Sequence, residues 1–157
     1  MTVKPVALGV ISDTHGLLRP EVVAALRCSD RILHAGDIGG PEILEALAQI
    51  APVIAIRGNI DTDPWARTLP ETEVVEAGGV SIYILHDLGR VDLKPEAAGF
   101  RVVVYGHSHQ PKIEEKHGVL YFNPGSAGPR RFRLPVSMGK LLIEAGRVRA
   151  ELVELKI

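Results

Sequence analysis

The chain has 157 residues, of which 46% are hydrophobic and 24% charged, a composition typical of a soluble globular protein with a sizeable core. Its formal net charge of −1 provides no overall attraction to nucleic acid or to an anionic membrane. The single cysteine, Cys28, excludes an internal disulfide, and we expect it to be buried at a helix end. No targeting segment and no apolar run of membrane-spanning length is evident, so we expect a cytoplasmic protein.

The first half of the chain alternates between predicted strands and helices. Short apolar runs predict three strands, at 6–11, 31–34 and 53–57. Two helices are predicted between them, near 20–27 and at 41–49. Pro20 suits the first turn of the earlier helix. This alternating order predicts a parallel sheet with helices packed on it.

After Leu69 the pattern changes to strands joined by short turns. Further strands are predicted at 73–77, 80–86, 101–105, 112–116, 119–122, 138–144 and 148–155. Gly78-Gly79 and Ala145-Gly146 are typical of hairpin turns. A parallel half and a hairpin-rich half predict two packed sheets with helices outside. No linker or repeat divides the sequence, so we interpret residues 1–157 as one domain.

Polar side chains follow five of the predicted strands. They are Asp13 and His15, Asp37, Asn59 and Asp61, His86, and finally His107 and His109. In open α/β sheets, ligands bind beyond the carboxyl ends of the strands. Carboxylate, amide and imidazole groups together suit Mn, Fe, Zn or Co better than Ca or Mg. These ligands are too numerous for one ion and fit two ions that share a carboxylate.

The run Gly106-His107-Ser108-His109 follows the apolar segment Val102-Val103-Val104-Tyr105. Alternate side chains of an extended segment point to the same side. This pattern alone suggests that both histidines bind a single ion.

The ordered motifs resemble those of the calcineurin-like metallophosphoesterases. The matching segments are Asp13-x-His15, Gly36-Asp37, Gly58-Asn59-x-Asp61, His86 and Gly106-His107-x-His109. Asn123-Pro124-Gly125-Ser126 further resembles the small bacterial and archaeal phosphodiesterase branch. The resemblance spans roughly residues 6–126. It implies an α/β fold, a four-layer αββα sandwich of two mixed sheets flanked by helices.

The resemblance also implies a dinuclear metal site. Asp13, His15 and His109 would hold one ion, Asn59, His86 and His107 the other, with Asp37 bridging them. The cofactors implied are two divalent transition-metal ions, Mn first, with Fe, Zn, Co or Ni also fitting. A metal-bridging hydroxide would attack a small phosphodiester, a monoester or a cyclic nucleotide. Asn59 and His86 are also expected to bind substrate, and Asn59 to orient a phosphate oxygen.

Two positions depart from the family pattern. Ile60 stands where many relatives carry a histidine that protonates the leaving group, and Ile60 has no proton to give. Asp61 is the nearest substitute as a catalytic acid; alternatively it caps the loop or orients a ligand. Asp87 stands where relatives often carry glycine, and it either hydrogen-bonds a ligand imidazole or faces solvent.

Three other features have two interpretations each. His34 is interpreted as a structural residue at a strand end rather than as a ligand. Arg130, Arg131 and Arg133 form either a solvated loop or a site for a substrate phosphate or a partner subunit. Trp65 packs in the core or shelters the metal site.

We interpret the chain as a metal-dependent phosphoesterase that acts on a small phosphoester substrate. Among phosphoesterases, a phosphodiesterase is the first choice. The alternative is a protein-interaction scaffold. The superfamily resemblance includes the retromer subunit, which uses this fold with an altered site and little or no activity. Every ligand position is kept here, which favours the enzyme. The neutral charge disfavours a nuclease, no membrane partner is expected, and a homo-oligomer stays open.

Overall fold

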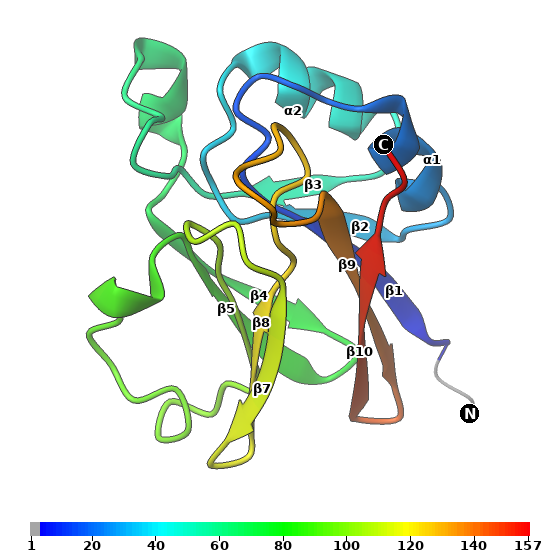
Figure 1. Ribbon diagram of the computed structural model, residues 1–157. Coiled ribbons are helices and arrows are strands. Elements are labelled where there is room, and N and C mark those ends of the chain that lie inside the picture. The colour runs from blue at the N-terminus through cyan, green and yellow to red at the C-terminus, as the bar shows by residue number, and fades with distance from the viewer. Residues whose placement is uncertain (1–3) are drawn as a thin grey trace.

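The computed structural model describes residues 4–157 and contains two five-stranded β-sheets packed face to face (Figure 1). The first sheet has the strand order β10-β9-β1-β2-β3. Its strands are β1 Val6–Ile11, β2 Arg31–His34, β3 Val53–Ala55, β9 Ser137–Glu144 and β10 Arg147–Glu154. The second sheet has the order β4-β5-β6-β8-β7. Its strands are β4 Thr72–Ala77, β5 Val80–Leu85, β6 Val102–Val104, β7 Lys112–Lys116 and β8 Val119–Asn123.

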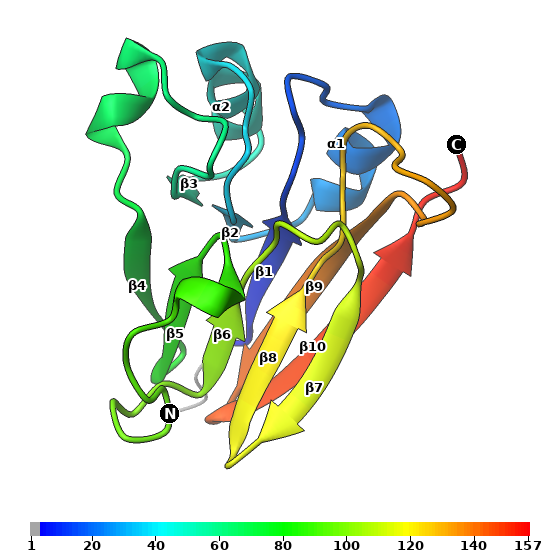
Figure 2. The same ribbon diagram turned by 60° about the vertical axis from the view of Figure 1, so that its left-hand side comes forward.

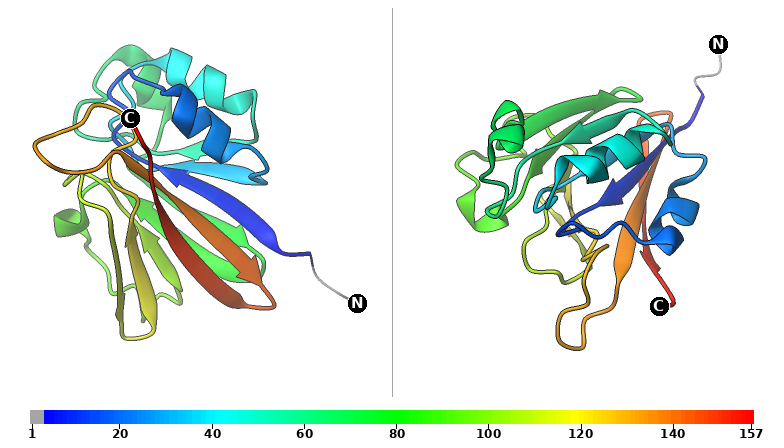
Figure 3. Two further views of the ribbon diagram at one scale, coloured as in Figure 1. Left: turned by 45° about the vertical axis from the view of Figure 1, so that its right-hand side comes forward. Right: turned by 90° about the horizontal axis from the view of Figure 1, so that it is seen from above.

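Helices cover the outer face of the first sheet (Figures 1 and 3). They are α1 Pro20–Leu26 and α2 Pro41–Ala48, and each begins with a proline, which suits a first helical turn. Two short 3-10 helices, η1 Pro64–Thr68 and η2 Leu88–Arg90, follow β3 and β5. No helix within residues 4–157 is both long and apolar enough to cross a membrane.

Strand alternation explains the two main layers of the core. In β1, Leu8 and Val10 point into the space between the sheets, whereas Ile11 packs with the helices. Phe122 of β8 is fully buried in the inter-sheet core. On the outer face of the second sheet, Tyr83 and neighbouring apolar residues are covered by side chains of the segment that contains η2. This outer layer has a 3-10 turn where the first sheet has α-helices.

The structure confirms the predicted α/β sandwich, and most element bounds agree within one or two residues. The third strand ends earlier than predicted, at Ala55, because the N–H of Arg57 donates to the carbonyl of Pro70 outside the sheet. The expectation for Cys28 is wrong. This thiol is exposed, and its residue has a φ of 73° in the turn after α1.

Both sheets bring the carboxyl ends of parallel strands to the same end of the molecule. β1, β2 and β3 are parallel neighbours in the first sheet, as are β5, β6 and β8 in the second. Figure 2 shows the arrowheads of β1, β5, β6 and β8 pointing the same way. The loops that carry the polar motifs therefore meet above the inter-sheet core.

Candidate metal centre

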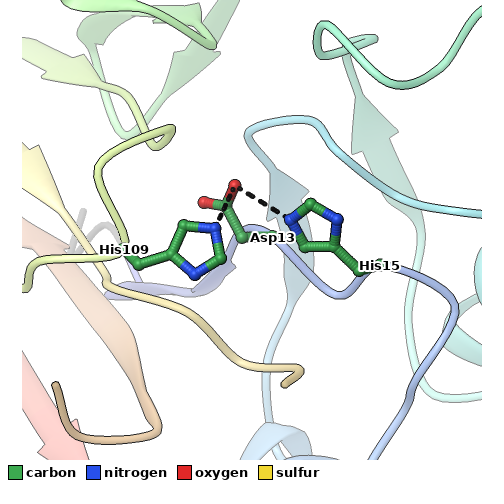
Figure 4. Close-up of side chains that lie close together, drawn as sticks. All are labelled: Asp13, His15 and His109. Atoms are coloured by element: carbon green, nitrogen blue, oxygen red, sulfur yellow. Dashed lines mark ion pairs between the residues drawn. The ribbon is translucent and has the colours of Figure 1, made fainter. Parts of the chain in front are cut away.

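Two groups of side chains converge at this end of the molecule. Asp13, His15 and His109 offer ligand atoms that lie within 4.8 Å of one another (Figure 4), and Asp37, His86 and His107 do the same. Each group combines residues from both sheets. The division agrees with the grouping implied by the family motifs, and it separates His107 from His109.

One oxygen of Asp13 is held by the protein, and the other faces the first group. Oδ2 accepts hydrogen bonds from the Ser12 hydroxyl at 2.8 Å and from the N–H of His107 at 3.2 Å. Oδ1 lies 3.4 Å from His109 Nε2 and 3.7 Å from His15 Nε2, as Figure 4 shows. Asp13 Oδ1 and His15 Nε2 are buried without a hydrogen-bond partner. Such orphaned acceptors fit a bound cation.

Asp37 lies between the two groups. Its Oδ1 accepts from the N–H of Ile60 at 3.1 Å. Its Oδ2 is 3.2 Å from His86 Nε2 in the second group and 3.6 Å from His15 Nε2 in the first. Asp37 Oδ2 thus faces both groups, so this carboxylate could be shared between two cations.

Hydrogen bonding fixes the orientation of His86. Its Nδ1–H donates to the Ala35 carbonyl at 2.7 Å, which directs Nε2 toward Asp37. Burial alone would lower the pKa of His86, but the hydrogen bonds to Asp37 and Ala35 outweigh it and raise that pKa. Burial likewise opposes the fall in the pKa of Asp37, which the His86 contact produces. His86 Nε2 and Asp37 Oδ2 therefore both face the space that a cation could fill.

The Asn59 side chain adds a further potential metal-ligand atom, its amide oxygen, to the second group. Its Oδ1 lies 3.3 Å from His107 Nδ1. With the amide turned by half a rotation, its NH₂ would donate to Asp37 Oδ2 at 3.2 Å and to His86 Nε2 at 3.0 Å. The oxygen therefore faces an arrangement of acceptors, which is the environment that a cation satisfies.

Left-handed backbone geometry marks the candidate ligands. Five of them have positive φ values, namely Asp13 at 57°, His15 at 46°, Asp37 at 56°, His107 at 73° and His109 at 62°. Such values are uncommon outside glycine and cost roughly 1–2 kcal/mol per residue. They concentrate at functional sites. Here they turn each side chain away from its strand direction and into the shared space.

A family model described as the calcineurin-like phosphoesterase superfamily domain matches residues 6–146. A probable metallophosphoesterase of Methanocaldococcus jannaschii is 32% identical over 95% of this chain and 81% of its own length. A phosphodiesterase of the same organism is 26% identical over 75% of this chain and 82% of its own length. The chain belongs to the calcineurin-like phosphoesterase superfamily. These relatives bear out the expectation of a metal-dependent phosphoesterase.

The fold of this chain is also similar to that of solved structures that are not described as phosphoesterases. The structure of vacuolar protein sorting 29 from Cryptosporidium parvum matches with a TM-score of 0.77. That alignment covers 98% of this chain and 99% of the other, at 21% sequence identity. At this identity the match shows the shared fold alone.

The third loop of this phosphoesterase holds Asp61 in a cage of backbone donors. The buried carboxylate accepts from the N–H groups of Ile38, Gly39 and Gly58 at 2.8–3.1 Å. This is the geometry of the loop-cap alternative, and the carboxylate ties the second strand-end loop to the third. Gly58 is required here because a Cβ would collide with Asp37 Oδ1.

Two further residues, not assigned to the site from the sequence, support its ligands. Asn123, from the motif noted only for its resemblance, donates from Nδ2 to the Gly106 carbonyl at 3.1 Å and to the Ser108 hydroxyl at 3.0 Å. Its own Oδ1 accepts from the N–H of Gly125 at 2.9 Å. Ser12, which carried no motif signal, orients Asp13.

Other candidate residues lie outside the two groups. Asp87 caps η2 by accepting from the N–H of Gly89 at 2.9 Å, a third role beside the two considered. His34 is buried at the end of β2, with Nδ1 accepting from Gly36 and Nε2 at 2.9 Å from the Thr14 hydroxyl, which fits its structural interpretation. Trp65 packs against the core beneath the helices.

The arginine cluster lies in a loop beside the first group. This 128–136 segment, orange in Figure 3, projects from the body of the molecule. Its base is tied to the end of β1, because the Ser126 hydroxyl donates to the Asp13 carbonyl at 3.2 Å. The charge of Arg131 is close enough to contribute to the lowered pKa of His109, whose main cause is burial. Phe132 is 89% exposed in the same loop.

Protonation of His34 is expected to destabilise the fold in acid. Burial lowers its pKa from 6.5 to about 4. Between these values the unfolded chain binds more protons, so stability is retained above pH 6.5 and falls as the pH drops toward 4. Between pH 7 and 4.5, the free energy of unfolding measured in urea should fall by about 2–3 kcal/mol less for His34→Gln than for the wild type. His117→Gln, at an exposed turn, should behave like the wild type; identical pH dependence of all three proteins would contradict the assignment.

Asn123→Asp is expected to loosen the histidine loop. The change keeps the acceptor for Gly125 but places a carboxylate against the Gly106 carbonyl, and leaving that buried acceptor unpaired costs about 1–3 kcal/mol. Urea unfolding should show this loss, and calorimetric titration with Mn²⁺ should show weaker binding. The matched control is Gln110→Glu, an exposed amide on the same loop. Unchanged stability and Mn²⁺ affinity in Asn123→Asp would show that Asn123 does not position the loop.

Proposed function

We propose that this chain is a dinuclear-metal phosphodiesterase that hydrolyses a small phosphodiester, and that monoesters or cyclic nucleotides are secondary substrates. The observation that supports the proposal is the pair of ligand groups, with Asp37 Oδ2 within 3.6 Å of a histidine nitrogen of each. The family supports the reaction class.

The proposed ligands divide between two cations. Asp13, His15 and His109 would hold the first, and Asn59, His86 and His107 would hold the second, with Asp37 shared. Two such cations would supply an activated water at neutral pH and neutralise negative charge on the phosphate. Imidazole, carboxylate and amide ligands suit several divalent ions, of which we propose Mn²⁺ before Fe, Zn, Co or Ni.

The protein's own groups fix this centre before substrate arrives. The Ala35 carbonyl holds the His86 ring, the Ile60 N–H holds Asp37, and the His107 N–H holds Asp13. Preorganised ligands keep their geometry when charge develops on the phosphate, which is what electrostatic stabilisation requires. The exposed amide of Asn59 lies at the solvent edge of the second group, so we assign to it and to His86 the contact with a substrate oxygen.

We assign Asp61 to the loop rather than to proton transfer. A catalytic acid must direct a proton toward the leaving group, whereas both oxygens of Asp61 accept hydrogen bonds from the backbone. Ile60 offers no proton either. The reaction therefore depends on leaving groups that depart as stable anions, such as phenolates.

A protein-interaction scaffold is the second candidate. Two observations favour it: the fold likeness to vacuolar protein sorting 29 and the exposed Phe132 beside three arginines. The complete set of ligand side chains favours the enzyme. A screen of the metal-free protein with Mn²⁺, Fe²⁺, Zn²⁺, Co²⁺ and Ni²⁺ against bis(p-nitrophenyl) phosphate, an aryl monoester and a cyclic nucleotide separates them. Inactivity in every combination would favour the scaffold.

Asp37→Asn is expected to lower metal content and activity together. Loss of the shared negative charge should reduce bound Mn²⁺ from about two ions per chain to one or fewer and reduce kcat about 100-fold or more. Elemental analysis after dialysis and hydrolysis of bis(p-nitrophenyl) phosphate measure the two effects. Asp63→Asn, an exposed carboxylate near η1 and outside both groups, is the control. Full activity of Asp37→Asn without bound metal would exclude the mechanism.

The missing acid is expected to make the rate depend steeply on the leaving group. General-acid assistance contributes about 10²–10⁴-fold, so methyl p-nitrophenyl phosphate should react at least about 100-fold faster than methyl phenyl phosphate. Asp61→Asn should lower stability, since the loop loses a charged acceptor, but leave this ratio the same. If Asp61→Asn instead slowed the phenyl ester alone, Asp61 would be the acid after all.

A further inference from the structure

A cleft of about 990 Å³ opens from the second ligand group along the outer side of the second sheet. At its inner end lie the candidate ligands Asn59, His86 and His107. Its floor includes Tyr83 and Leu85, two largely buried residues of β5. The volume is typical of pockets that hold a small organic molecule. Any phosphoester held by Asn59 and His86 therefore has room for one substituent in this cleft.

The two walls of the cleft come from the loops that carry these same ligands. Arg67 belongs to η1, which follows the Asn59 loop, and Arg90 belongs to η2, which follows His86. In Figure 1 the two short green helices stand apart on the left side of the molecule, η1 above η2. Each of these two loops thus contributes an arginine to the lining of the cleft.

Several of the charged groups that line the cleft already have partners within the protein. Arg57 pairs with Glu71 at 3.3 Å, Asp61 is held by backbone donors, and Asp87 accepts from Gly89. Asp92 also lines the cleft. Within residues 4–157, neither Arg67 nor Arg90 has a carboxylate within 4.0 Å of its guanidinium, so both are available to an anionic ligand.

We propose that the cleft is a specificity subsite in which Arg67 and Arg90 bind a second anionic group of the substrate, so that the preferred substrates are phosphodiesters whose organic substituent carries a further phosphate. The proposal rests on the proposed function for the placement of the reacting phosphate. Arg is well suited to the role because its planar guanidinium can bind two phosphate oxygens at once. Tyr83 and Leu85 supply an apolar floor for the organic part between the two anions.

A matched pair of chromogenic diesters tests this subsite. Thymidine 5′-(p-nitrophenyl phosphate) and the same compound with a 3′-phosphate differ only in the second anion. We expect the wild type to show a kcat/KM about tenfold or more higher for the 3′-phosphorylated substrate. Arg67→Gln and Arg90→Gln should each reduce this preference about fivefold, and the double variant should abolish it.

Arg149→Gln on β10, an exposed arginine of the first sheet, is the matched control and should keep the wild-type preference. Binding provides a second readout that does not depend on turnover. In calorimetric titrations of the metal-free protein, thymidine 3′,5′-bisphosphate should bind more tightly than thymidine 5′-phosphate, and the Arg67 and Arg90 variants should lose that difference. These exposed side chains are not needed for folding, which circular dichroism will confirm for each variant.

The outcomes separate the subsite from the reaction. Hydrolysis of neither diester with any of the five metals would count against the proposed function. Equal hydrolysis of both diesters, or a preference for the one without the 3′-phosphate, would overturn the subsite and leave the function standing. A preference that both arginine variants retain would also overturn it, because the second anion would then be bound elsewhere.

Discussion

The candidate metal centre depends on one contact between the two sheets, where the loop after β6 meets the end of β1. The N–H of His107 donates to Asp13 Oδ2, and Gly106 permits the approach because a Cβ would lie 2.8 Å from the same oxygen. The apolar core sets the spacing of the sheets, whereas this contact aligns their carboxyl edges. Each ligand group draws residues from both sheets, so neither would be complete if the edges were misaligned.

The same region carries most of the backbone strain in the structure. Five candidate ligands have positive φ, and such geometry persists only where the surroundings hold it. Hydrogen bonds between neighbouring loops do this: Asp13 N–H donates to the Gly36 carbonyl at 3.0 Å, and His15 N–H donates to the Asp37 carbonyl at 2.9 Å. Cation binding therefore does not have to order these loops. Little of the free energy of cation binding would then be spent on ordering the loops.

Much of this arrangement could be predicted from the sequence, and the reasons for the rest are specific. The predicted bounds of β1, β2 and β7 are the observed ones, and the polar residues after the strands supplied all members of both groups. Strand alternation alone assigned His107 and His109 to one ion, because it does not foresee the left-handed turns that separate them. The role of Asn123 depends on a carbonyl 17 positions away, a contact that residue spacing does not reveal.

The ligands and the cleft residues share their loops but are held in different ways, and this separates metal binding from substrate choice. Asp37 and His86 are fixed by buried hydrogen bonds, whereas Arg67 and Arg90 are exposed on short helices further along the same loops. A substitution at either arginine changes what the cleft attracts and leaves those buried bonds in place. A substitution at Gly58 would instead disturb the ligand region, because the Gly58 N–H donates to Asp61 and a Cβ at this position would collide with Asp37. Substrate preference can therefore change along this fold while the ligand geometry stays the same.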